Sequence, residues 1–178
     1  ESEDRQPEAP SRPSPFVYDV YLRTRRDIWS FVPERMKRAR TELDRAIERY
    51  QRSIEAHPTA EAHTFLGWTL SFQGRLGEAT EECLRAIAID PEFGNPYNDI
   101  GVYMMKRDKL DEAIPWFEKA KQAKRYEPRQ FPFMNLGQIY IRQRRWWEAL
   151  HEFEGAVRLV PRDHDAAKML HHVRARLN

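Results

Sequence analysis

Apolar and small residues recur in register along the chain from residue 60 onward. A leucine or isoleucine followed by glycine occurs three times, at intervals of 34 and 36 residues, as Leu66-Gly67, Ile100-Gly101 and Leu136-Gly137. Three residues after each glycine stands another apolar residue, namely Leu70, Met104 or Tyr140. Apolar positions that recur every three or four residues are typical of amphipathic helices. No stretch alternates apolar and polar residues around an Asn-Gly or Asp-Gly turn, so the pattern predicts an all-α fold.

A second set of positions follows each glycine at larger distances. An alanine stands twelve residues later, then a phenylalanine or cysteine, and then another alanine. These residues are Ala79, Cys83 and Ala86, then Ala113, Phe117 and Ala120, and finally Ala149, Phe153 and Ala156. The units end at Pro91, Pro128 and Pro161, and proline stops a helix because it lacks the amide hydrogen. Each unit therefore predicts two helices joined by a polar turn, with small residues letting the backbones approach and larger ones filling the space between them.

Taken together, these positions resemble the tetratricopeptide repeat, a helix–turn–helix unit of 34 residues. The resemblance extends over residues 27–161 and implies a right-handed α-solenoid. Three units match well, at 60–93, 94–129 and 130–163, and the last begins two residues late because of an insertion around Arg125-Tyr126-Glu127. Residues 164–178 are expected to form a C-terminal capping helix that covers the last apolar face. Its apolar residues at helical spacing are Ala167, Leu170, Val173 and Leu177.

An earlier unit, 27–59, matches the repeat in its second half only. The matching residues there are Ala46, Tyr50, Ser53 and Pro58. In the first half, Pro33 and Glu34 stand where the apolar residue and the glycine are expected. We therefore treat 27–59 as a degenerate repeat.

The chain before residue 27 divides into two parts. Residues 1–15 contain four of the 12 prolines and no bulky apolar residue, so they cannot bury enough surface to offset the entropy of ordering and predict a disordered Pro-rich tail. The next seven residues contain three aromatic residues, two valines and a leucine. We expect 16–26 to be an apolar docking segment, with Phe16, Tyr18 and Tyr21 packed on the repeat array of the same chain or of a neighbouring copy.

Charge and chemistry-bearing residues exclude several functions. Thirty Lys and Arg against 28 Asp and Glu give a net charge of +2, and acidic residues interrupt the basic run at 35–52. We therefore expect no nucleic-acid partner. No stretch reaches the roughly 20 apolar residues of a transmembrane helix. Phosphate loops, the G-x-S-x-G turn and the H-E-x-x-H motif are absent, so we expect no enzyme, no catalytic residues and no cofactor.

The cysteine and the histidines favour structural or solvent-exposed roles. Cys83 is the only cysteine, which excludes an internal disulfide, and it occupies a core position of the repeat. We expect it to be a small buried residue because no histidine or basic group is placed to lower its pKa. His171 and His172 are adjacent and point about 100° apart on a helix, whereas His164 and His171 share a face. We interpret these three histidines as exposed residues of the capping helix and expect no metal site.

The resemblance also implies where a partner would bind, because the first helices of stacked repeats line a concave groove. Outward positions of these helices form an apolar stripe flanked by amides and a carboxylate. The predicted groove residues are Phe65, Trp68, Phe72, Asn98, Asp99, Val102, Met105, Phe131, Met134, Asn135, Gln138 and Ile141. The alternative is that some of them belong to the core between helices. A stripe this apolar needs cover, and large aromatics beside amides are suited to a peptide.

The sequence thus predicts a non-catalytic scaffold or adaptor that binds a peptide or protein partner in this groove. The alternative is a structural, self-associating repeat protein, a homo-oligomer whose groove is filled by the N-terminal segment of its own or a neighbouring chain. Some members of the family hold the C-terminal carboxylate of chaperones with lysine, arginine and asparagine. The corresponding positions here are Thr64, Trp68, Asp99, Phe131 and Asn135. Only the asparagine matches, and Asp99 would repel a carboxylate, so that role is disfavoured.

The compartment stays open at this point. The first residues do not form a basic and then apolar signal peptide, which favours the cytoplasm. A chain that begins with Glu1 instead of Met is also consistent with a processed exported form, so the cytoplasm is favoured only slightly.

Overall fold

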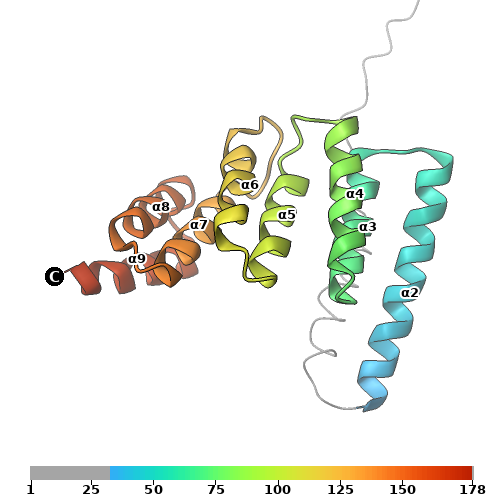
Figure 1. The fold of residues 1–178 in the computed structure, drawn as a ribbon, viewed down its shortest axis with the longest axis horizontal. Helices are drawn as coiled ribbons and strands as arrows, with labels where there is room; N and C mark the ends of the chain where they lie inside the picture. The colour runs from blue at the N-terminus through green and yellow to red at the C-terminus, as the bar shows by residue number, and fades with distance from the viewer. Residues whose placement is uncertain (1–32, 178) are drawn as a thin grey trace, which may run out of the picture.

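The computed structural model describes residues 33–177, and these residues form an array of helices (Figure 1). The predicted tail 1–15 and docking segment 16–26 lie outside the described residues. In chain order the helices are α2 (Pro33–Ala56), α3 (Ala60–Phe72), α4 (Leu76–Ile89), α5 (Asn95–Lys106), α6 (Leu110–Gln122), α7 (Phe131–Arg142), α8 (Trp146–Leu159) and α9 (His164–Leu177). The prediction of an all-α solenoid is confirmed. None of the helices in this part of the chain is long and apolar enough to cross a bilayer.

Three helix pairs, α3–α4, α5–α6 and α7–α8, form the body of the array, with α2 before them and α9 after them. Each pair turns at a residue with positive φ, seven positions after the repeat glycine: Gly74 (77°), Asp108 (61°) and Arg144 (59°). The amide of the following residue then closes the turn onto a carbonyl at the end of the first helix. These bonds run from Arg75 to Leu70 (3.2 Å), from Lys109 to Met104 (3.0 Å) and from Arg145 to Tyr140 (2.8 Å). Glycine and aspartate suit this left-handed conformation, whereas Arg144 adopts it because the same closing bond holds the turn.

The repeated small and large residues form the core, as predicted. The alanines twelve residues after each glycine, together with Cys83, Phe117 and Phe153, have no exposed surface. A Cβ atom added at Gly101 would lie 2.7 Å from the Phe117 ring, and one at Gly137 would lie 2.6 Å from the Phe153 ring. The two helices of each pair therefore approach at a distance that only glycine allows. Burial raises the pKa of the Cys83 thiol, so this side chain behaves as the small buried residue expected.

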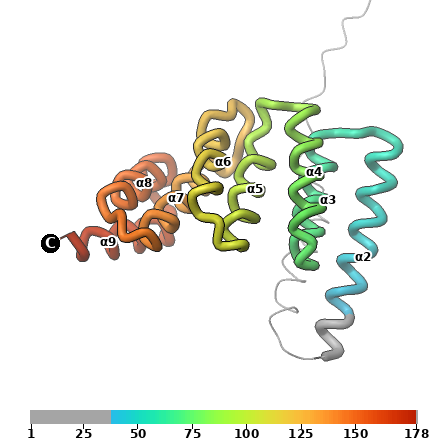
Figure 2. The backbone as a smooth tube through the Cα atoms, in the orientation of Figure 1, coloured from blue at the N-terminus to red at the C-terminus, as the bar shows by residue number. Residues whose placement is uncertain are grey.

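Contacts between successive pairs define the two sides of the array, and Figure 2 shows the pairs following one another along it. The first helices touch one another, α3 with α5 and α5 with α7, whereas the second helices α4, α6 and α8 make fewer such contacts. The first helices are therefore closer together, and the array bends toward them. We call the solvent-exposed surface of α3, α5 and α7, on the side toward which the array bends, the inner face.

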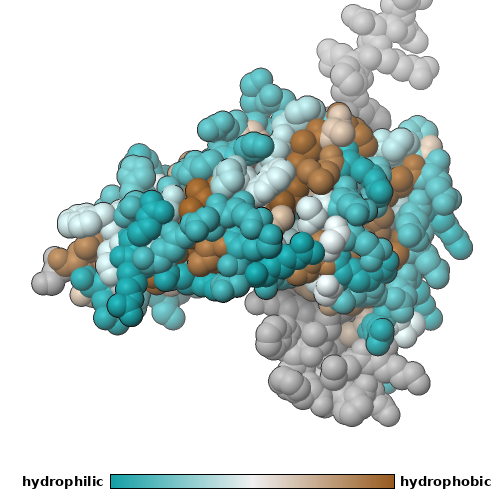
Figure 3. All heavy atoms as spheres, in the orientation of Figure 1, coloured by the Kyte–Doolittle hydropathy of each residue, from teal (hydrophilic) through white to brown (hydrophobic). Residues whose placement is uncertain are grey.

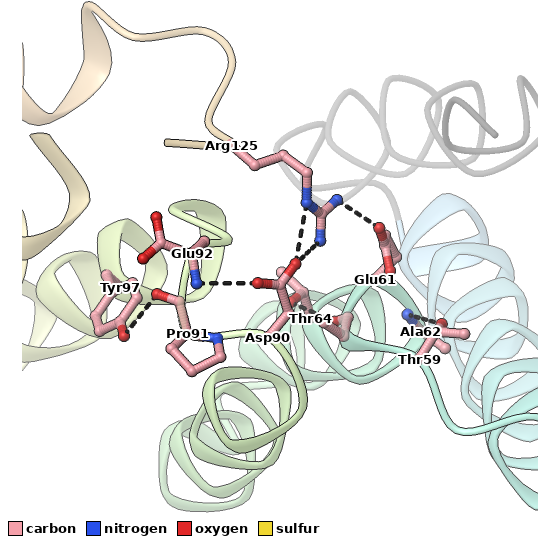
Figure 4. A network of polar contacts seen from close by, with 10 residues as sticks. Thr59, Glu61, Ala62, Thr64, Asp90, Pro91, Glu92, Tyr97 and Arg125 are labelled. Atoms are coloured by element: carbon pink, nitrogen blue, oxygen red, sulfur yellow. Dashed lines mark hydrogen bonds and ion pairs between the residues drawn. The ribbon is translucent and has the colours of Figure 1, made fainter. Parts of the chain in front are cut away.

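The insertion between α6 and α7 contacts both the α4–α5 loop and the start of α3. The Arg125 amide donates to the Glu92 carbonyl (3.0 Å), and the Arg125 carbonyl accepts from the Gly94 amide (2.9 Å). Its guanidinium bonds the carboxylates of Asp90 and Glu61 (Figure 4) and lies 4.2 Å from the centre of the Phe93 ring. Glu61 is 64 residues earlier, at the start of α3. The sequence locates the insertion but not this role.

Two expectations about the outer helices need correction. In α2, Leu43 and Ile47 are buried, whereas Ala46 is half-buried and Ser53 is exposed. The helix is therefore rotated relative to the face expected from the repeat. In α9, Ala166 is buried instead of Ala167 because Asp163 begins the helix, its carboxylate accepting from the Ala166 amide (2.9 Å). Leu170 and Val173 are buried as predicted.

Candidate partner-binding surface

Aromatic side chains gather at the α3 end of the inner face. Phe65, Trp68 and Phe72 follow one another at helical spacing on α3, and each is half-buried. The Trp68 and Phe72 ring centres are 5.4 Å apart, and Tyr50 of α2 stacks on Phe65 at 6.0 Å. We call these four residues the aromatic cluster. They offer a large apolar area that is preorganised by ring contacts.

Charged groups of α5 adjoin this cluster. The Lys106 ammonium lies 6.0 Å from the centre of the Phe72 ring and 5.9 Å from that of Tyr103. Desolvation lowers the pKa of Lys106, and the nearby Asp99 carboxylate opposes this change. Desolvation also raises the pKa of Asp99 to about 7, against the effects of a hydrogen bond with Asn98 and of the Lys106 charge. Asp99 is thus a carboxyl group that changes charge near neutral pH.

Two amide side chains connect α5 to α7. The Asn135 amide nitrogen donates to the Asn98 side-chain oxygen at 3.0 Å. Asn98 is buried, with 9% of its surface exposed, whereas Asn135 is half-buried. An asparagine carries two amide hydrogens and an acceptor oxygen, so Asn135 retains groups that can bond a peptide backbone.

The predicted groove residues divide into three sets by exposure. Phe131 and Gln138 are exposed on α7, and Asn98 is buried, so its side chain serves mainly to hold α7. The remaining nine are half-buried. Four of these pack against the core around Phe117 and Leu136, so they contribute to the core as well as to the inner face, as the alternative held: Val102, Met105, Met134 and Ile141. Partner binding by these residues stays a prediction.

Two residues of this surface, Tyr50 and Lys106, are not among the predicted groove residues. From the sequence, Tyr50 is only a residue that matches the degenerate repeat. In the structure it stacks on Phe65. It also packs against the core around Ile47 and Leu66. Lys106 occupies an outward position at the end of α5, and only the structure places it against aromatic rings. Neither contact is signalled by the repeat pattern, because both depend on the neighbouring helix.

The second helices carry exposed apolar residues of their own. On the side seen in Figure 3 the surface is mainly hydrophilic, and apolar atoms gather over the C-terminal end of α4. Leu84 and Ile89 of α4 are each nearly half exposed, and Trp147 of α8 is 69% exposed. Exposed apolar side chains are ordinary on protein surfaces. These three residues do not form a cluster of packed rings like that on α3.

We expect Asp99→Asn to stabilise the protein in a pH-dependent way. Between the ordinary pKa of 3.8 and the folded value of about 7, the folded state holds a proton that the unfolded chain has lost. The stability of the natural protein therefore falls as pH rises through this window. One pKa unit corresponds to about 1.4 kcal/mol, and because Asp99 keeps part of its surface in water we expect a net gain of about 1 kcal/mol for the variant above neutral pH.

Thermal unfolding of both proteins at about pH 8 and about pH 4 measures this effect. The stabilisation should be present at the higher pH and vanish at the lower one. Asp108→Asn is the control, since Asp108 is an exposed turn residue with positive φ, a conformation that asparagine also adopts. A gain for Asp99→Asn that does not vary with pH would contradict the raised pKa.

A family profile described as tetratricopeptide repeat matches residues 37–92. The chain therefore resembles the tetratricopeptide repeat family over this part of its length. The type IV pilus assembly protein PilF of Pseudomonas aeruginosa is 26% identical to this repeat protein over 110 residues, which cover 61% of this chain and 44% of PilF. The chain thus spans less than half the length of that relative.

Solved structures of several proteins share the fold. The PilF structure superposes with a TM-score of 0.66 at 20% identity, over 90% of this chain and 70% of PilF. The first repeat domain of Spaghetti (RPAP3), bound to an HSP90 peptide, gives 0.59 at 18% identity, over 66% of this chain and 92% of that domain. YrrB, described as having an unusual peptide-binding site, gives 0.57 at 21% identity, over 76% of this chain and 69% of YrrB. At these identities the likeness concerns the fold.

Proposed function

We propose that this protein is a non-catalytic interaction scaffold that binds a peptide or protein partner on its inner face, with the aromatic cluster as the main anchor. The observation that carries the proposal is the row of half-buried aromatic residues on one helix, Phe65, Trp68 and Phe72, with the Trp68 and Phe72 ring centres 5.4 Å apart. Clustered aromatics in partly desolvated positions dominate the energy of many interfaces. Two proteins with the same fold, the Spaghetti domain and YrrB, are described as binding peptides.

The chemistry of the inner face favours a partner with an exposed apolar side chain and free backbone groups. The apolar side chain would pack on Trp68 and Phe72, and Asn135 would bond the adjacent peptide backbone. A carboxylate of the partner placed beside Asp99 would be repelled above about pH 7, where Asp99 is itself negatively charged. We therefore propose a partner different from the acidic C-terminal peptide held by some family members.

Selection of binders from a displayed library of random peptides, followed by affinity measurement, tests this function. Trp68→Ala should weaken the selected peptides by at least about tenfold, since removing an aromatic anchor of this kind costs more than about 1.4 kcal/mol. Far-UV circular dichroism should show that the helices are retained.

Trp147→Ala is the matched control, because it removes the same side chain from α8, where Trp147 is 69% exposed. This variant should bind the selected peptides as the natural protein does. Loss of binding in Trp147→Ala, with Trp68→Ala unaffected, would move the binding surface to the second helices and overturn the proposal.

A further inference from the structure

Among the residues that the structure describes, no helix packs on one side of α2. Each later second helix packs both on the first helix of its own pair and on the helix that follows, as α4 does on α3 and α5. Among the described helices, α2 packs closely on α3 alone. The place that a first helix would take in the degenerate unit 27–59 is therefore not filled by any element of residues 33–177.

The helix α2 also extends beyond the helix on which it packs. The Gln73 amide nitrogen, at the end of α3, donates to the Asp44 carboxylate in the middle of α2 at 2.7 Å. Because the two helices run in opposite directions, residues 33–43 continue past the end of α3 (Figure 1). At a rise of 1.5 Å per residue this extension is about 16 Å long.

Apolar residues on the extension are nevertheless buried. Ala39 lies more than one turn beyond Asp44 and is 2% exposed, and Leu43 is 5% exposed. With Ile47 they form a buried stripe at spacings of four residues, which is the pattern of a packed helix face. One turn further on, the Tyr50 hydroxyl is buried without a hydrogen-bond partner in the described part of the chain. Since α3 ends before it reaches Ala39, another segment must cover this stripe.

We propose that residues 16–22 of the same chain cover the stripe and take the place of the missing first helix. This segment holds three aromatic residues, two valines and a leucine in seven positions, and a second apolar stretch, 28–32, directly adjoins α2. The ten residues that join Leu22 to Pro33 can span about 33 Å when extended, which is enough to reach any point on the stripe. Arg23, Arg25 and Arg26 follow the segment, and the exposed carboxylates of Glu42 and Asp44 flank the stripe. The proposal does not depend on the partner-binding function, because it concerns the stability of the chain itself.

A thermal unfolding cycle in the full chain tests this contact. Ala39→Asp would place a charge under the segment and should lower Tm by about 4–8 °C, the size expected for a buried unpaired polar group in a chain of this length. The triple variant Phe16→Ser, Tyr18→Ser, Tyr21→Ser should also lower Tm. Adding Ala39→Asp to the triple variant should then produce almost no further loss, because the cover is already gone.

Two controls match these changes. Ala167→Asp introduces the same residue at an exposed alanine in the first turn of α9 and should change Tm little. Pro7→Ser, Pro10→Ser, Pro13→Ser makes three substitutions in the Pro-rich tail and should be silent. If Ala39→Asp lowers Tm equally in the natural chain and in the triple serine variant, the proposal is overturned, since the described helices would then cover Ala39. Loss in neither background would show that the stripe is open, and a Tm that falls on tenfold dilution would identify a second copy as the occupant.

Discussion

Gly101→Leu is expected to lower the free energy of unfolding by about 3 kcal/mol, the upper end of the range for overpacking a core. A Cβ atom at this position would lie 2.7 Å from two atoms of the Phe117 ring. Phe117 has no exposed surface and is surrounded by other core residues, so the ring cannot move aside. Relief of the clash requires α5 and α6 to separate. Urea unfolding followed by circular dichroism measures the loss.

Gly77→Leu is the matched control for this substitution. Gly77 stands in the first turn of α4, where an added Cβ atom would come no closer than 3.7 Å to the end of the Arg107 side chain. Leucine is a better helix former than glycine by somewhat less than about 1 kcal/mol, so this variant should be neutral or slightly more stable. An unchanged urea midpoint for Gly101→Leu would mean that α5 and α6 are not packed through this glycine.

The register of these glycines is the part of the fold that sequence reasoning predicts best. Gly101 and Phe117 are sixteen residues apart, and the same pair recurs at Gly137 and Phe153. Three copies of one short-range pattern distinguish the core from chance. The all-α solenoid follows from that pattern because each contact joins residues of the same unit or of the next one.

Contacts that occur once along the chain are beyond this kind of reasoning. Arg125 reaches Glu61 across 64 residues, and Asn135 reaches Asn98 across 37. No regular spacing in the sequence predicts such pairs, because each depends on the curvature of the whole array. The positive φ at Arg144 recurs in each pair, but its residue type does not predict it, since arginine has no preference for this conformation.

The candidate surface is partly predictable from the sequence, less than the repeated core and more than the long-range contacts. Helical spacing places Phe65, Trp68 and Phe72 on one face of α3. The structure brings the Trp68 and Phe72 rings together and stacks Phe65 on Tyr50. Whether Met105 or Ile141 faces a partner or the core depends on the tilt of the adjacent helix, and both prove to be shared between the two. The titration of Asp99 near neutral pH follows from burial and could not be derived from its position in the repeat.

Arg125→Met is expected to lower the free energy of unfolding by about 2 kcal/mol, because it removes one partner of a partly buried charge network. The side chains of Asp90 and Glu61 are only 30% and 28% exposed, and both would lose their cation. The guanidinium also lies over the Phe93 ring, an attraction that methionine does not reproduce. The variant should therefore loosen the junction between α3, the α4–α5 loop and the α6–α7 loop, which hydrogen exchange at Gly94 and Arg125 would detect.

The loss of stability in Arg125→Met should depend on pH, and it should be larger than the loss from replacing an exposed arginine. Partial desolvation would raise the pKa of Asp90, but hydrogen bonds from Arg125 and from backbone amides outweigh it and lower the pKa below 3.8. The pair therefore stabilises the fold above about pH 4, and the difference between Arg125→Met and the natural protein should shrink in more acidic solution as the carboxylate becomes protonated. Arg142→Met is the control, since Arg142 also bonds a distant carboxylate, that of Asp108, but this pair is exposed and should contribute little. Equal destabilisation by the two variants, or a loss that persists unchanged in acid, would show that the Arg125 network does not join the repeats.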